Sequence, residues 1–161
     1  MAFDAFINID DIEGESTDDQ HPGWIEVLDC SVGIKQKISK TASSAGGASA
    51  ERAEFNDFSF TKELDAASPK IALACANGTH IDTITVQFCR AGTQKVKFMT
   101  YKLTNCIISE VSMAAAGDFP SESVNINHGK IEWCYTQQNR AGGRPAGNVA
   151  AGWDLQRNCK M

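Results

Sequence analysis

The sequence predicts a mainly β protein, an antiparallel β-barrel of two curved sheets with one short flanking α-helix at about residues 69–77. Three observations support this fold class. In most segments apolar residues recur at every second position, which is the period of a half-buried strand. The longest segments change phase midway, as strands do where they bend around a barrel. One stretch, residues 65–80, instead carries the start and stop signals of a helix.

The segment WIEVLDCSVGIKQKI, residues 24–38, predicts a strand with one apolar and one polar face. Its apolar row consists of Leu28, Cys30, Val32 and Ile34. Its polar row consists of Asp29, Ser31, Gly33 and Lys35. Because alternate side chains of a strand point to opposite faces, the apolar row should pack in a core and the polar row should meet water.

Residues 80–90, HIDTITVQFCR, alternate in the same way, with Ile84, Val86 and Phe88 on one face. Two later segments, 94–113 and 123–138, also alternate but change phase along their length. In the second, apolar residues hold even positions before Gly129 and odd positions after it. We therefore expect an inserted residue near Gly129, which is the sequence mark of a β-bulge.

The stretch DAASPKIALACANGTH, residues 65–80, predicts the helix. Ser68 is expected to cap its free amides, Pro69 suits the first turn, and Gly78 suits the left-handed residue at the end. A helix so bounded has about two turns and needs a sheet to cover its apolar stripe. The stripe consists of Ile71, Ala74 and Cys75.

Two stretches rich in Gly, Ala and Ser show no periodicity. We expect residues 39–53 to form an extended mobile loop and residues 137–152 to form a Gly/Ala-rich loop, because small side chains bury little apolar surface. Loops of this length in a compact domain are usually either functional or disordered, and composition alone does not choose between these outcomes.

Composition excludes several functions. The chain of 161 residues is expected to form one domain over 1–161, and its net charge of -5 with scattered basic residues argues against a nucleic-acid partner. Neither a signal peptide nor a membrane-spanning segment is recognisable, so we expect folding in a reducing cytoplasm and no membrane insertion. The six cysteines lack the close pairs typical of metal sites, and we expect small buried thiols with no metal and no cofactor.

Catalytic motifs are absent from the sequence, and we expect no enzyme activity. The strongest enzymatic alternative is a cytosolic cysteine hydrolase using Cys75 and His80, five residues apart. Against it, Cys75 lies near the carboxyl end of the predicted helix, where the helix dipole disfavours a thiolate. His21 lies in the polar turn DDQHPG, and His128 ends an apolar row, a position that favours a hydrogen-bonded core histidine.

Two long stretches, residues 6–36 and 58–81, resemble the Hcp family (haemolysin-coregulated protein), the tail-tube proteins of bacterial type VI secretion. The first matches the family opening F-I-x-I-x-x-I-x-G-E-S from Phe6 to Ser16. The second matches the family core around FTKELDAASPKIALAC and Gly78. The closing segment GWDLQRNCK, residues 152–160, is similar to the last strand of the family. The resemblance therefore covers the full length of the chain.

This resemblance implies a barrel that assembles as a homohexameric ring, with rings stacked into a tube that a contractile sheath drives out of the cell. The implied partners are other copies of the chain, the VgrG spike, the sheath and small effector proteins carried in the lumen. The protein would start in the bacterial cytoplasm and leave by the type VI route without a signal peptide. A bacteriophage-type tail-tube protein, which shares the barrel and ring logic, is the nearest alternative.

Two sets of residues are candidate sites within that arrangement. The polar row of residues 24–38 would correspond to the lumen wall of the ring, with Asp29, Ser31 and Lys35 able to contact an effector. The loop 39–53 would contact the next ring, because small residues fit a stacking surface without needing a pocket. Its candidate contact residues are Ser43, Ser44, Gly46 and Gly47.

Overall fold

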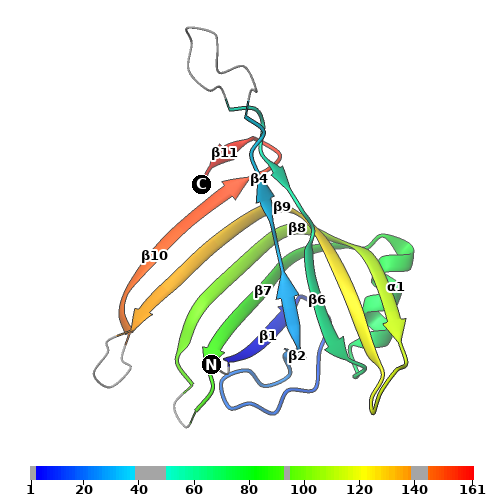
Figure 1. Cartoon of the computed structure of the whole chain (residues 1–161). Helices are drawn as coiled ribbons and strands as arrows, with labels where there is room; N and C mark the ends of the chain where they lie inside the picture. Colours follow the sequence, from blue (N-terminus) through cyan, green and yellow to red (C-terminus); the bar gives the residue numbers. More distant parts are fainter. Residues whose placement is uncertain (1–2, 39–49, 93–94, 139–144) are drawn as a thin grey trace, which may run out of the picture.

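The computed structural model describes residues 3–38, 50–92, 95–138 and 145–161 and confirms a mainly antiparallel β fold with one short helix (Figure 1). The first elements are β1 Phe3–Ile9, β2 Ile25–Val27, β3 Asp29–Ser31, β4 Ile34–Lys35, β5 Glu54–Phe55 and β6 Phe58–Glu63. The helix α1 Ser68–Asn77 follows, and then β7 His80–Arg90, β8 Lys97–Ala114, β9 Ser121–Gln138, β10 Pro145–Asp154 and β11 Cys159–Lys160.

The strands pair in sequence around the barrel, and β2 and β3 connect the two ends of that series. β1 pairs with β7, β7 with β8, β8 with β9, β9 with β6, and β6 with β3. β2 pairs with β1, and the Leu28 N–H between β2 and β3 donates to the Thr61 carbonyl at 2.8 Å. The two expected curved faces are therefore parts of one nine-stranded sheet. β10 and β11 extend that sheet beyond the barrel, on the β9 side (Figure 1).

The barrel interior holds the core, and the predicted alternation of residues 80–90 is confirmed there. Ile84 and Val86 of β7 are fully buried, while Phe88 is partly buried against the same cluster. Helix α1 closes one side of the barrel through Ile71 and Ala74, both buried. Cys75 packs against the core from the same helix, as its stripe position indicated.

The phase change near Gly129 is real, but the inserted residue predicted there is wrong. Thr104 lies opposite Lys130 and Cys106 lies opposite His128, so the register is unchanged across Gly129. Instead Asn105, opposite Gly129, adopts the left-handed conformation (φ 56°), which asparagine tolerates better than most residues. On both strands, the side chains that point into the core switch at this point from one set of alternate positions to the other. The register shift of the ladder lies farther along, between Ile108 and Glu110.

The strand expected over residues 24–38 is divided into β2, β3 and β4. Its first part pairs with β1, its second with β6, and its third leaves the barrel to pair with β5. Each change of partner turns the chain, so the apolar row is not buried along its length. Cys30 and Val32 pack against the core, whereas Leu28 and Ile34 are 57% and 52% exposed.

The Gly/Ala-rich loop expected over residues 137–152 is mostly wrong. Residues 137 and 138 end β9, and residues 145–152 belong to β10, which pairs with β9. Main-chain hydrogen bonds need no large side chains, so this strand carries none of the apolar alternation by which a sequence reveals one. Most of the expected mobile loop, residues 39–49, lies outside the described residues, with Ala50 bridging to Ile38 just after it.

Helix α1 begins and ends close to the predicted positions, but Ser68 does not cap it. Pro69 lies in its first turn, and Gly78 takes the left-handed conformation (φ 65°) at its end. The residue before the helix is Ala67, and no side chain caps the free amides. The Ser68 hydroxyl instead accepts a hydrogen bond from the Asp65 N–H at 3.0 Å and donates to Glu122 at 2.8 Å.

A buried lysine explains this role of Ser68. The Lys62 side chain, on β6, is fully buried, and its ammonium lies 2.6 Å from Glu122 Oε1 on β9 and 2.8 Å from Asp65 Oδ1. It also donates to the Ser68 hydroxyl at 3.0 Å and to the Glu63 carbonyl at 2.9 Å. A buried charge needs this degree of pairing. The cluster ties the start of α1 to two strands of the barrel.

We expect Lys62→Met to destabilise the fold by about 3–5 kcal/mol, because it leaves the Glu122 carboxylate buried without its cation. Replacing both partners, with Lys62→Met and Glu122→Met, should recover part of that loss. The control is Lys70→Met, an exposed lysine on α1, which should cost about 1 kcal/mol or less. Urea unfolding followed by circular dichroism measures all three; equal losses in Lys62→Met and Lys70→Met would contradict the assigned role.

Candidate assembly surfaces

The core of the barrel continues outward along β8, β9 and β10 as an apolar surface. Cross-strand pairing aligns three rows on one face: Leu103, Ile131 and Trp153; then Tyr101, Trp133 and Ala151; then Met99, Tyr135 and Val149. The exposed fraction of the side chains rises from the first row to the third. Leu103 and Ile131 are fully buried, Tyr101 and Trp133 are partly buried, and Tyr135 and Val149 are 47% and 69% exposed. The last two rows form the apolar wing face, which the described residues of one copy leave partly uncovered.

The outer edge of β10 is also open. β9 pairs with β10 on one side, whereas β11 covers only Trp153 and Asp154 on the other. Over residues 145–151 no strand of the described chain lies on that outer side. A free edge presents unpaired N–H and C=O groups and favours pairing with another chain. This edge belongs to the strand that carries Val149 and Ala151 of the apolar wing face, so the two surfaces adjoin, and β10 lies at the margin of the sheet (Figure 1).

The outside of the barrel carries a belt of small polar residues across β3, β6, β9 and β8. One row of paired residues is Ser31, Ser59, Asn125 and Glu110, and the next is Asp29, Thr61, Ser123 and Ser112. Asp29 and Ser31 are exposed, and Cys30 between them packs against the core, as the alternation predicted. We call these two rows the polar belt.

The polar belt does not include every predicted site residue. Lys35 is exposed but lies on β4, in the separate two-stranded ribbon with β5, so it is not on the same sheet as Asp29 and Ser31. Sequence reasoning also missed Ser59 and Asn125. Their signal was available, since each occupies the polar position of an alternating strand, but pairing between distant strands places them beside Ser31. The loop residues Ser43, Ser44, Gly46 and Gly47 lie outside the described residues.

Hydrogen bonds hold the side chains of this outer face in place. The Ser109 hydroxyl donates to Asp57 at 2.6 Å, and the Asn127 amide donates to the other oxygen of the same carboxylate at 3.1 Å. The Asn125 amide donates to Glu110 at 3.0 Å. These contacts join strands through short side chains, which leaves a wet surface without long protruding groups.

His21 lies in a buried network rather than in an isolated polar turn. Its ring is 2% exposed and stacks on Phe6, with Nδ1 2.8 Å from Asp18 Oδ1 and Nε2 2.7 Å from Gln87 Oε1. The Lys95 ammonium hydrogen bonds the other oxygen of Asp18 at 2.6 Å, and it lowers the pKa of that carboxyl to about 2. The network fastens the 10–24 connection to β1 and β7. Gln87 is 66 positions away, so no local pattern reveals it.

The predicted Cys75 and His80 pair is not assembled as a catalytic site. Cys75 packs inward from α1, whereas His80 is exposed with its ring 3.7 Å from the Asp82 carboxylate. No hydrogen bond joins the two side chains in the described part of the chain. Cys89 does lie 3.9 Å from His21 Nε2, but it is fully buried, and burial raises the pKa of its thiol.

The remaining buried titratable groups also point to packing. Burial raises the pKa of Cys106 to about 12 and that of Cys30 to about 11. His128 is buried beside the Phe55 ring, and burial lowers the pKa of its imidazole. His128 is a core histidine, as expected, but neither ring nitrogen has a close hydrogen-bond partner among the described residues. No group of three His, Cys, Asp or Glu side chains in the described ranges is placed to hold a metal ion.

Comparisons with known proteins define the class. A family model described as "Type VI secretion system effector, Hcp" matches residues 6–135. The chain is also 33% identical over 161 residues to protein hcp1 of Pseudomonas aeruginosa, covering 98% of each. These matches identify a component of type VI secretion. The chain belongs to the Hcp family, whose members are structural proteins of that system.

Solved structures agree with this assignment. One, described as a type six secretion system protein, superposes with a TM-score of 0.93 at 30% identity, over 99% of this chain and 100% of that one. Hcp1 from Salmonella typhimurium gives a TM-score of 0.81 at 28% identity, over 100% of each chain. The ten residues of α1, the single helix in the described ranges, are too few to cross a membrane.

We expect the buried thiols to resist alkylation in the native protein. Iodoacetamide at neutral pH should leave Cys89 and Cys106 unlabelled until the chain unfolds, because both are fully buried and burial raises their pKa values. Cys75 should react no faster than an ordinary accessible thiol, and His80→Ala should leave its rate unchanged. Peptide mass spectrometry over time measures each rate. A rapid reaction at Cys75 that depends on His80 would revive the hydrolase alternative.

Proposed function

We propose that the chain is the ring-forming subunit of a type VI secretion tube, acting by self-assembly without catalysis. The observation that carries this proposal is the apolar wing face beside the open edge of β10. Tyr135 and Val149 are 47% and 69% exposed on a sheet that is otherwise built around a buried core. A second copy that covers this face and pairs with the edge would complete both the burial and the main-chain hydrogen bonds.

A ring follows when the same contact repeats around an axis. A contact between two different surfaces of identical copies either closes into a ring or continues as a filament, depending on the rotation between copies. The wing stands at one side of the barrel and α1 at the other, so the two sides of a copy are different surfaces (Figure 1). Membership of the Hcp family supports closure, and we infer a homohexamer.

The polar belt is the proposed lumen wall. Its rows contain hydroxyl and amide side chains, which can donate or accept a hydrogen bond with a passenger, together with the carboxylates Asp29 and Glu110, which only accept. Ser31 and Asp29 are exposed at one end of these rows. We infer that small effector proteins contact this surface, and that Lys35 reaches them only from the β4–β5 ribbon.

The remaining partners follow from the family. We infer that rings stack through the 39–53 region, including Ser43, Ser44, Gly46 and Gly47, that a contractile sheath surrounds the tube, and that the VgrG spike caps it. The protein would leave the bacterial cytoplasm by the type VI route.

Ring formation is tested by the mass of the native complex. We expect the wild-type chain to sediment as a hexamer and Val149→Glu to shift the population to monomers, at least tenfold at micromolar concentration, because a charge on the wing face must be buried without a partner. Val149→Ile is the control and should keep the hexamer. Circular dichroism checks that the charged variant is folded. A wild-type chain that stays monomeric at high concentration contradicts the proposal.

The lumen assignment is tested separately. We expect Ser31→Trp to leave the hexamer intact and to reduce co-purification of an effector by at least tenfold, because the bulky ring projects from the polar belt. Glu132→Gln, on β9 outside the polar belt and facing away from the apolar wing face, is the control and should retain the effector. Unchanged effector recovery with Ser31→Trp would place the passenger on another surface.

A further inference from the structure

His128 of β9 is buried where the β4–β5 ribbon leaves the barrel. The ribbon comprises residues 34–38 and 50–55, and His128 is 4% exposed. Neither of its ring nitrogens has a close hydrogen-bond partner among the described residues. An unpaired buried polar group destabilises the native state, and such groups are rare in native proteins. His128 therefore requires an explanation beyond packing.

The base of the ribbon packs on this histidine. The Phe55 ring lies edge-on to the imidazole, with ring centroids 6.4 Å apart and an interplanar angle of 86°. Of the apolar side chains described on the ribbon, Phe55 alone packs against the core cluster. The ribbon beyond it rises past the end of the barrel (Figure 1), and its two isoleucines are exposed. The Phe55 contact is therefore the ribbon's main apolar attachment to the barrel.

Polar contacts also attach the ribbon to the rest of the chain, and they do not change with pH. At the base, the Asn56 N–H donates to the Gly33 carbonyl at 2.9 Å. Farther out, the Arg52 guanidinium donates to the Leu155 carbonyl at 2.6 Å. Backbone groups do not titrate, and arginine stays charged wherever proteins are folded. A response to pH between about 5 and 8 must therefore act through another group, of which histidine is the usual one.

The titratable groups closest to His128 do not prepare its site for a positive charge. Asp57 already accepts hydrogen bonds on both carboxylate oxygens, from the Ser109 hydroxyl at 2.6 Å and from the Asn127 amide at 3.1 Å. Across the ladder His128 lies opposite Cys106. The Cys106 thiol stays neutral, because burial raises its pKa to about 12.

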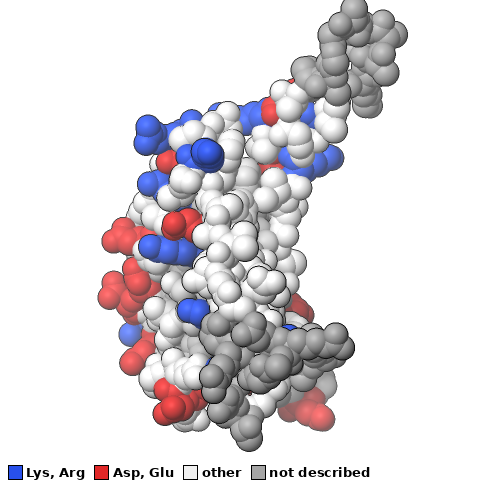
Figure 2. Space-filling view, turned by 90° about the vertical axis from the view of Figure 1, so that its left-hand side faces the viewer, with Lys and Arg blue, Asp and Glu red and all other residues white. Residues whose placement is uncertain are grey.

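Two further acids on the elements beside His128 are also paired. Asp154, at the end of β10, lies 3.9 Å from the Lys130 ammonium, and Glu54 on the ribbon pairs with Lys37. The ribbon's other charged side chains are exposed to solvent: Lys35, Glu51 and Arg52. On the face that Figure 2 shows, Lys and Arg gather toward the ribbon end of the molecule, and most Asp and Glu lie below them. A positive charge on His128 is therefore added among like charges.

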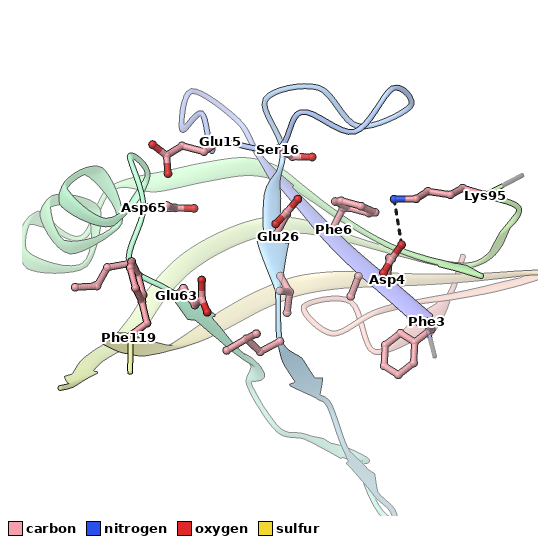
Figure 3. Close-up of a pocket in the computed structure, with 14 residues that line it drawn as sticks. Phe3, Asp4, Phe6, Glu15, Ser16, Glu26, Glu63, Asp65, Lys95 and Phe119 are labelled. Carbon is pink, nitrogen blue, oxygen red and sulfur yellow. Dashed lines mark ion pairs between the residues drawn. The ribbon is translucent and has the colours of Figure 1, made fainter. Parts of the chain in front are cut away.

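The other buried histidine, His21, lies in a site that tolerates a positive charge. Its Nδ1 is 2.8 Å from Asp18 Oδ1. Lys95 pairs with the other oxygen of Asp18 and with Asp4, and Figure 3 shows the pair with Asp4. A proton on His21 therefore strengthens an existing hydrogen bond by adding charge to it. A proton on His128 instead places a charge in a buried site where the described residues offer no close acceptor.

We propose that protonation of His128 releases Phe55 from the barrel and frees the β4–β5 ribbon to move about its base. Once the ribbon opens, water reaches the imidazolium and supplies the hydrogen bonds that the closed form lacks. The Phe55 side chain loses its packing in exchange. This release takes place within one copy of the chain and does not require a ring.

The pH at which the ribbon opens depends on which form binds the proton more tightly. Burial has the largest effect on the pKa of His128 in the closed form and lowers it, while Asp57 opposes this effect only in part. In the open form the imidazole is solvated, and its pKa returns to about 6.5. The open form therefore binds the proton more tightly. The ribbon stays closed above about pH 6.5 and opens increasingly as the pH falls below that value.

Hydrogen exchange followed by mass spectrometry, corrected for the intrinsic exchange rate at each pH, tests this release. Between about pH 7.5 and about pH 5.5, protection of the peptide that contains Asn56 should fall at least about threefold in the wild type. Protection around Leu28, whose N–H donates to the Thr61 carbonyl within the barrel, should not change. In His128→Phe, which keeps a ring but cannot take up a proton, the response at Asn56 should disappear.

His80→Gln is the control, because it removes an exposed histidine and should keep the wild-type response. Circular dichroism at about pH 7.5 checks that both variants are folded. A response that persists in His128→Phe, or equal losses of protection at Leu28 and Asn56, would overturn the proposal. Exchange of the imidazole Cε1 hydrogen in the wild type measures the His128 pKa without any variant, and a value at or above about 6.5 would also overturn it.

Discussion

The structure depends on the pairing between β8 and β9, two strands of 18 residues each. At about 3.3 Å per residue, each spans about 60 Å, which is longer than the wall of one small barrel needs. One half of the paired length therefore contributes side chains to the core, together with α1, β6 and β7. The other half continues outside and supports β10. The same continuous run of β8–β9 hydrogen bonds therefore forms the barrel wall and places apolar side chains beyond it, where they remain uncovered.

Alternation along these strands gives the molecule surfaces of distinct chemistry. Inward positions are apolar, and past the barrel they become the apolar wing face. Outward positions of β3, β6 and β9 are short and polar, forming the polar belt. The proposed sideways contact and the proposed lumen surface therefore fall on different parts of one sheet.

Sequence reasoning recovered what local patterns specify. The alternation of β7, the exposure of Ser31, and the Pro69 and Gly78 boundaries of α1 all follow from residues within a few positions of one another. It failed where the partner is distant or only main chain is involved. β10 has small side chains and was expected as a loop, His21 depends on Gln87, and Ser68 serves Lys62 rather than the helix amides. The open edge of β10 cannot be predicted from periodicity either, because whether a strand lies at an edge depends on which strands pair with it.

All six cysteines are free thiols in the structure, two of them fully buried, and no covalent cross-link contributes to the fold. Noncovalent packing, the paired main chain and the enclosed Lys62 cluster hold the molecule together instead. A chain of this design reaches its final form without an oxidant or an isomerase. Because no disulfide is part of this fold, folding of the chain does not depend on an oxidising compartment.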